Sequence, residues 1–135
     1  MPYECSWEPH GVVKRFWGML SGFELATSVE AIAAHPDFDN LHYIINDFRE
    51  VDCHRIDHTS VERIAVARLG SMATNPNIRV LVICSDPTLI ASMDAAASDA
   101  LLRDTYETRR FETMEQCRSW LSRQPALHNP PRRFG

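Results

Sequence analysis

Apolar side chains follow two alternating spacings along the chain, and these spacings predict strands and helices in turn. Gly11 to Leu20 is rich in β-branched and aromatic residues, and Tyr3 to Trp7 can pair with it across the turn Glu-Pro-His-Gly. These two segments predict an opening β-hairpin. Leu41 to Asn46 has the composition of a further strand.

Two later segments complete the predicted sheet. Ile78 to Cys84 is almost uniformly apolar, which is typical of a strand that helices cover on both faces, so we expect it at the centre of the sheet. Thr105 to Phe111 is polar and β-prone, which favours an edge strand.

Four helices are predicted from capping residues followed by apolar positions at helical spacing. Capping-box pairs stand at Ser21 with Glu24, Thr59 with Glu62 and Thr113 with Gln116, and Asp86 precedes Pro87 as a fourth cap. Prolines at 36 and 76 should end the first two helices. The predicted buried positions are Leu25, Val29, Ile32 and Ala33; Val61, Ile64, Ala65, Leu69 and Met72; Leu89, Met93, Ala97 and Leu101; and Met114, Cys117, Trp120 and Leu121.

The order of these elements predicts the fold class. Helices that follow strands from Leu41 onward act as crossovers between parallel strands. We therefore expect one α/β domain over residues 1–123, with a mixed, mostly parallel sheet of four or five strands and about four helices. Asp47 to His58 is interpreted as a long polar connection, and 124–135, with three prolines, as an extended tail.

Composition narrows the class of protein. A chain of 135 residues with 44% hydrophobic residues can enclose one core. Its net charge of −4 argues against a nucleic-acid partner, and no apolar run approaches the ~20 residues that span a bilayer. The first residues show no export signal, so a bacterial cytoplasmic location is expected. The cysteines at 5, 53, 84 and 117 are then interpreted as thiols, with Cys84 and Cys117 in the core.

The element order, together with particular segments, resembles the STAS superfamily (sulphate-transporter and anti-sigma-factor-antagonist domains), especially its SpoIIAA-like branch. The resemblance covers about residues 11–121 and includes Leu-His-Tyr-Ile-Ile-Asn followed by Asp47-Phe48, the strand ending at Cys84, and the closing Arg110-Phe111-Glu-Thr113 with Trp120-Leu121. It implies a compact regulatory or protein-interaction domain with a protein partner and without assigned catalytic activity.

In signalling members of this superfamily, an Asp-Ser-Ser-Gly-like motif follows such a strand, and a partner kinase phosphorylates its second hydroxyl. Here the corresponding segment is Asp57-His58-Thr59-Ser60, with Val61 where the motif has glycine. The resemblance makes Thr59 and Ser60 phosphorylation candidates. The residues themselves favour capping by Thr59, because Asp57 and Glu62 would repel a phosphate.

Three other groupings could carry chemistry. Cys53, His54 and His58 are weak metal-ligand candidates, since the usual cysteine pairs are missing, and Cys53 could act as a nucleophile beside a histidine.

The glycines form neither a dinucleotide nor a phosphate-loop fingerprint, so no cofactor is expected and a catalytic function is disfavoured. Aromatic residues are interpreted as core rather than as a ligand pocket.

Small molecules bind open α/β sheets beyond the carboxyl ends of the strands. Such a ligand would lie near 46–48, 85–86 and 111–113, so Asp47, Asp57, His58 and Asp86 are the interaction candidates. A small-molecule-binding domain or an enzyme that uses these ends and the Asp52 to His58 segment is the alternative function. The tail could dock onto a second subunit through Phe134, and a homodimer is expected.

Overall fold

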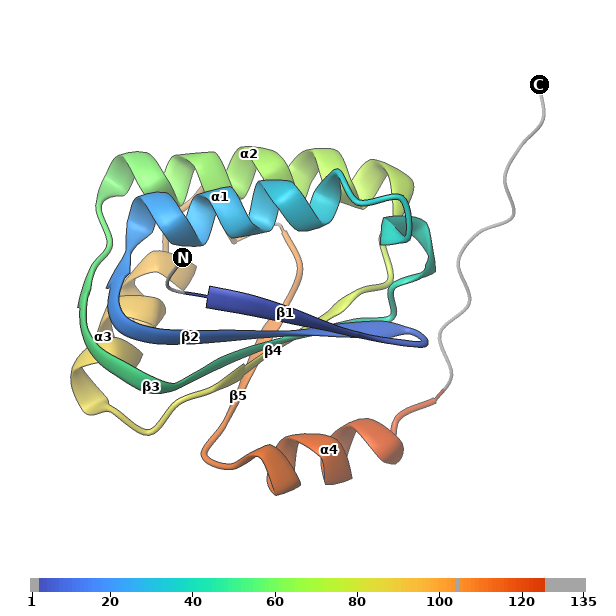
Figure 1. The fold of residues 1–135 in the computed structure, drawn as a ribbon. Helices are drawn as coiled ribbons and strands as arrows, with labels where there is room; N and C mark the ends of the chain where they lie inside the picture. Colours follow the sequence, from blue (N-terminus) through green and yellow to red (C-terminus); the bar gives the residue numbers. More distant parts are fainter. Residues whose placement is uncertain (1–2, 104, 126–135) are drawn as a thin grey trace.

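Five strands form one sheet, in the order β1-β2-β3-β4-β5, in the computed structural model, which describes residues 3–103 and 105–125 (Figure 1). The strands are β1 (Tyr3–Glu8), β2 (Gly11–Ser21), β3 (Tyr43–Arg55), β4 (Arg79–Ile83) and β5 (Thr108–Phe111). β1 and β2 form the antiparallel hairpin, and the other three neighbouring pairs are parallel. The predicted α/β class and the mixed, mostly parallel sheet are confirmed.

Helices cover both faces of this sheet. α1 (Gly22–Ala33), α2 (His58–Thr74) and α3 (Pro87–Ala97) pack on one face, and α4 (Met114–Ser122) packs on the other (Figure 1). A 3₁₀ turn at Phe38–Asn40 follows α1. The predicted caps Ser21, Asp86 and Thr113 each accept a hydrogen bond from a backbone N–H of the first turn.

The predicted connection from Asp47 to His58 is wrong for most of its length, because β3 continues to Arg55. β4 pairs with β3 only as far as Asp47, whereas β2 stays beside β3 up to the pair Ser21–Arg55. The second half of β3 therefore has a partner on one side only and little cover, which explains its polar composition.

The cap of α2 also differs from the prediction. Asp57, rather than Thr59, is the N-cap, and its carboxylate accepts a hydrogen bond from the Ser60 N–H at 2.9 Å. Both residue types cap helices well, and the longer strand places Asp57 at the turn. Thr59 lies inside the first turn of α2 and is exposed.

Three predicted buried positions, Leu69, Ala97 and Leu101, are exposed. Leu69 lies on the outer side of α2, because the inward positions of this helix are Val61, Ile64 and Arg68. Leu101 lies beyond the end of α3 at Ala97 and cannot extend its apolar stripe. Ala97 is the last residue of α3, so all three errors come from extending a regular helical spacing to residues that do not follow it.

The predicted strand Ile78 to Cys84 is buried in the sheet but is not central. β4 lies fourth in the order, between β3 and β5, so the central strand is β3. β5 is the edge strand, as predicted, but it begins at Thr108 rather than at Thr105. Of the predicted tail, residues 126–135, which include Phe134, lie outside the described residues.

Strand alternation divides the core into two layers. Val12 and Phe16 of β2 face α1 and α3, whereas Ile45 of β3 and Leu81 of β4 face α4 with Cys117. Gly18, at a register shift in β2, has φ 69°, a conformation that favours glycine. Because Lys14 lies between Val12 and Phe16, the alternation turns its side chain toward the helical layer of α1, α2 and α3.

Candidate functional site

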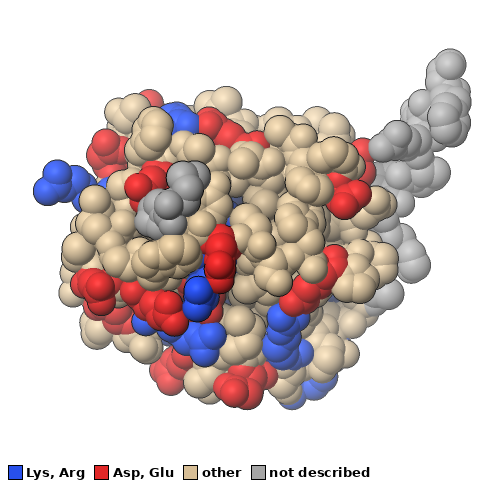
Figure 2. All heavy atoms as spheres, viewed as in Figure 1, with Lys and Arg blue, Asp and Glu red and all other residues tan. Residues whose placement is uncertain are grey.

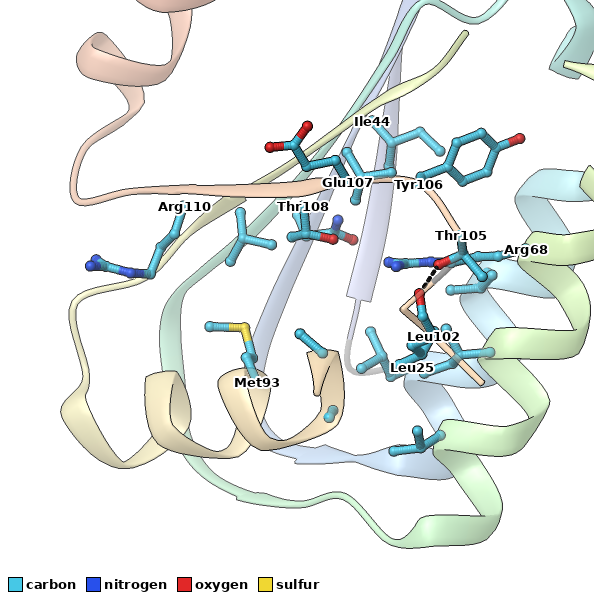
Figure 3. A pocket seen from close by; sticks show the side chains of 18 of the residues that line it. Leu25, Ile44, Arg68, Met93, Leu102, Thr105, Tyr106, Glu107, Thr108 and Arg110 are labelled. Carbon is cyan, nitrogen blue, oxygen red and sulfur yellow. Dashed lines mark hydrogen bonds between the residues drawn. The ribbon is translucent and has the colours of Figure 1, made fainter. Parts of the chain in front are cut away.

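A cavity of about 440 Å³ lies between the sheet and the layer of α1, α2 and α3 (Figure 3). Its size falls within the roughly 300–1,000 Å³ that is typical of small-molecule sites. Most of its wall is apolar. The apolar wall residues are Leu25, Val29 and Ile32 of α1, Val61 and Ile64 of α2, Met93, Ala96 and Ala97 of α3, Ile44, Phe48, Val80 and Val82 of the sheet, and Phe38, Ile56 and Leu102.

The cavity exists because α3 offers short side chains to it. Ala96 and Ala97 line the wall where larger residues would fill the space, and Leu89 is the only buried residue of α3. Leu101, predicted to extend this stripe, is exposed instead. The space between α3 and the sheet is therefore left open.

The chain's only lysine lies in the wall of this cavity. Lys14 is 2% exposed, and its ammonium donates a hydrogen bond of 3.0 Å to the Ser28 hydroxyl, which in turn donates to the Leu25 carbonyl. The ammonium also lies 5.7 Å from the centroid of the Phe16 ring. Burial, and then the positive charge of Arg68, lower the pKa of Lys14 to about 7.

Arg68 brings a second positive charge to the same cavity. It follows Val61 and Ile64 at helical spacing on α2, so its side chain points inward from a position where an apolar residue is expected (Figure 3). Burial lowers the pKa of the Arg68 guanidinium to about 10. No carboxylate among residues 3–103 and 105–125 lies within ion-pair distance of Lys14 or Arg68.

Polar groups surround these two cations. The buried amide of Asn46 donates to the Leu81 carbonyl, and the Ser71 hydroxyl donates to the Ala67 carbonyl. Asp94, Arg103, Glu107 and Arg110 also line the cavity, and all four are exposed to solvent. The exposed charges place its mouth between α3, residues 102–103 and 105–107, and the start of β5. A ligand with one charged group and an apolar remainder would find both environments here.

The predicted segment 57–60 lies beside the cavity rather than in it. A smaller hollow there shares Ile56, Val61 and Ala96 with the cavity wall and is also lined by Asp57 and His58. Hydrogen bonds from Ser60 lower the pKa of Asp57. The Ser60 side chain is buried against Gly22 of α1, where an added Cβ would approach its hydroxyl to 2.6 Å. Of the two phosphorylation candidates, only Thr59 has an exposed side chain.

Asp47 and Asp86 have structural partners. Arg49 donates two side-chain hydrogen bonds to Asp47, at 2.9 and 2.8 Å, and these hold the pKa of the buried carboxyl below its usual value although burial raises it. Asp47 follows Ile45 at strand spacing, so it faces α4 rather than the cavity. Asp86 caps α3 through the Thr88 N–H.

The metal-ligand candidates are not brought together. Cys53 is exposed, His54 lies 2.8 Å from the Ser92 hydroxyl of α3, and His58 lies 3.0 Å from Glu62 and 3.6 Å from Asp99. Within the described part of the chain, no three His, Cys, Asp or Glu side chains gather as a metal site. The histidines instead connect β3 and α2 to α3 and the turn that follows it.

The core interpretation is confirmed for Cys84 and Cys117 and, among the phenylalanines, for Phe16, Phe38 and Phe48, whereas Phe23 is 67% exposed and the tryptophans are only half-buried. Cys84 and Cys117 are buried, and all four cysteines are free thiols. Phe16 and Phe48 contact each other in the core, and Phe48 also lines the cavity. Neither Lys14 nor Arg68 was among the predicted site residues. The available signal was that each charge occupies a position that strand or helix periodicity assigns to the interior.

Charged side chains of both signs are interspersed on the face seen in Figure 2. Within the described residues, no helix combines the length and apolar character needed to cross a membrane. Lys14, which is buried, and Arg68, which is half-buried, belong to the cavity wall.

Comparisons with solved structures identify a SpoIIAA-like fold. The unphosphorylated form of the anti-sigma factor antagonist SpoIIAA matches with a TM-score of 0.58 and 14% identity, over 90% of this chain and 97% of that one. The phosphorylated form of SpoIIAA, a Bacillus cell fate determinant, matches with a TM-score of 0.54 and 14% identity, over 88% and 98%. An uncharacterised Shewanella loihica protein with a SpoIIAA-like fold gives 0.52 and 14%, over 88% and 91%.

No family model and no curated protein sequence matches the chain. The resemblance inferred from the sequence is confirmed at the level of the fold.

Proposed function

We propose that this chain is a non-catalytic regulatory domain that binds a small molecule in the cavity between the sheet and α1, α2 and α3. The observation that carries the proposal is the largely apolar cavity of about 440 Å³ with the chain's only lysine buried in its wall. A cavity with an apolar wall and a few convergent polar groups is the usual form of a small-molecule site. Small-molecule binding is the alternative derived from the sequence, but that alternative placed the ligand at the carboxyl ends of the strands and the Asp52 to His58 segment rather than in this cavity.

A regulatory role follows from what lies next to the cavity. α3 forms part of the wall and also touches His54 and, through the turn after it, His58. A ligand that shifts α3 would therefore change the surface at the start of α2. That surface is the predicted contact for a protein partner in the bacterial cytoplasm.

A neutral fluorescent dye, N-phenyl-1-naphthylamine, tests whether the cavity binds small molecules. The dye should brighten on binding wild-type protein. Ala96→Trp should weaken binding by about tenfold or more, because the indole would occupy the cavity. Ala91→Trp is the matched control, since Ala91 is an exposed residue of the same helix that does not line the cavity. Failure of the dye to bind wild type, or equal binding by both variants, would contradict the proposal.

A protein-interaction role at residues 57–60 is the second candidate function. It is supported by the fold shared with SpoIIAA, an anti-sigma factor antagonist whose structures include a phosphorylated form, and by the exposed Thr59 hydroxyl. Incubation with ATP and extract of the source organism should then add one phosphate that maps to Thr59 and is lost in Thr59→Ala. An added phosphate elsewhere would rule out this site.

The homodimer remains a proposal linked to the tail. Deletion of 126–135 should convert a dimer to a monomer in light scattering if the tail joins the subunits. An unchanged mass would show that it does not.

A further inference from the structure

Two cations face the cavity, and no anion among residues 3–103 and 105–125 forms an ion pair with either of them. The Lys14 ammonium has three N–H donors, and Ser28 accepts one of them. Arg68 makes no ion pair or side-chain hydrogen bond with a residue in the described ranges, although its guanidinium points into the cavity (Figure 3). The described part of the chain therefore leaves most of the donor capacity of both groups for a ligand.

Two like charges in an apolar wall are unfavourable in the empty protein. Removing a charge from water costs several kcal/mol unless a counter-charge or hydrogen bonds replace the water, and a neighbouring like charge adds to the cost. The acidic wall residues Asp94 and Glu107 are exposed and form no ion pair with either cation. An anionic group between Lys14 and Arg68 would remove this repulsion, whereas a neutral or cationic group would not.

The apolar part of the cavity wall favours a ligand whose remaining atoms are apolar. Val29 and Ile64 of the helical layer and Val80 of the sheet are hydrocarbon surfaces, and burial of apolar ligand surface against them contributes roughly 25 cal/mol per Å². A strongly hydrated ion such as free phosphate would leave this surface uncovered.

We infer that the cavity binds a small anion with an apolar body, such as a medium-chain carboxylic acid, with the carboxylate between Lys14 and Arg68 and the apolar body against α1, α2 and the sheet. This inference rests on the proposed function and adds the chemical class of the ligand to it.

Displacement of N-phenyl-1-naphthylamine by three probes of equal chain length tests the class. Sodium decanoate, 1-decanol and decylamine are compared at pH 6.5, below the concentrations at which they form micelles. Decanoate should bind wild type about tenfold or more tightly than decanol, and decylamine should bind most weakly.

Lys14→Met keeps an unbranched side chain and removes the charge. In this variant the preference for decanoate over decanol should fall to about threefold or less, while the dye still binds. Arg109→Met is the control, because Arg109 is an exposed cation of β5 that lies over Trp120 and does not line the cavity.

The possible results separate the two proposals. Equal displacement of bound dye by decanoate and decanol, or an undiminished preference in Lys14→Met, would overturn the inference and leave the small-molecule function standing. Failure of the dye itself to bind would remove the proposed function.

Discussion

The Lys14 ammonium donates a hydrogen bond of 3.0 Å to the hydroxyl of Ser28, joining the second strand of the sheet to the first helix inside the core. The Ser28 hydroxyl donates its own hydrogen bond to the Leu25 carbonyl at 2.7 Å, so it can only accept from Lys14. A single neutral acceptor does not balance a buried charge. The chain thus holds its only lysine at a position that opposes folding, which is typical of sites retained for function.

Replacement of this lysine should stabilise the protein. Lys14→Met is expected to raise the free energy of unfolding by about 1–4 kcal/mol near pH 6, because an apolar side chain suits the wall better than a charge. Urea denaturation monitored by circular dichroism gives the value. A loss of stability would mean that Lys14 has a compensating partner in the folded state.

The stability that Lys14→Met gains over the wild type should depend on pH in a definite direction. The pKa of Lys14 is about 7 in the folded protein and 10.5, the ordinary lysine value, in the unfolded chain. Between these two pH values the unfolded chain binds more protons than the folded protein, so the free energy of unfolding of the wild type rises with pH. The difference between Lys14→Met and wild type should be largest below pH 7 and shrink toward pH 10. A difference that is constant over this range would contradict the assignment.

Much of the fold is predictable from the sequence, and particular residues show where prediction fails. Ser21, Asp86 and Thr113 mark helix starts correctly because their hydrogen bonds are local. The continuation of β3 to Arg55 depends on β2, which lies some thirty residues earlier in the chain. No local pattern contains that pairing.

The site was harder to predict than the fold. Asp47 and Asp57 are polar residues at the ends of predicted elements, yet Arg49 and the start of α2 occupy their carboxylates. Lys14 and Arg68 become candidates only when β2 and α2 are seen to face the same space. A search for charges at buried positions of the predicted periods would have found both.

A second pair of charges joins the two ends of the described chain. Arg118 of α4 donates two hydrogen bonds of 2.6 Å to Glu8 of β1, and Tyr43 also donates to Glu8. The hydrogen bonds from Arg118 lower the pKa of the Glu8 carboxyl. The contribution of the Glu8–Arg118 contact to the free energy of unfolding is therefore fully present above the ordinary glutamate pKa. It is lost as the pH falls through the lowered pKa of Glu8.

Glu8→Gln should reduce the free energy of unfolding by about 1 kcal/mol at pH 7 and by much less below pH 4. Glu4→Gln is the control, because Glu4 forms a solvent-exposed ion pair with Arg15 and should change stability by less than about 0.5 kcal/mol. Chemical denaturation at both pH values provides the comparison. Equal changes in the free energy of unfolding for the two substitutions would show that the Glu8–Arg118 contact stabilises the fold no more than an exposed ion pair does.

His58 should restrain the helix that covers the cavity. Its imidazole lies 3.6 Å from Asp99, just beyond α3, and α3 has little buried surface of its own. His58→Ala should speed amide hydrogen exchange in α3 by about three- to tenfold, and dye entry should accelerate with it, because the local opening free energy falls by about 1 kcal/mol.

Glu62→Gln provides the control for this prediction. It alters the other partner of His58, at 3.0 Å, and leaves the contact with Asp99 in place. If exchange in α3 is unchanged in His58→Ala, or rises equally in both variants, the His58–Asp99 contact does not hold the helix.

The most direct test of the central claim is the protonation of Lys14 itself. Because the chain has one lysine, protein labelled with ¹³C at the lysine ε-carbon gives a single resonance whose shift follows the charge of this ammonium. The structure predicts a pKa of about 7 in the free protein. Saturating decanoate should raise it by about one unit or more, and decanol should not. A lysine that titrates at its ordinary value without ligand, or that ignores decanoate, would contradict an anion site at Lys14.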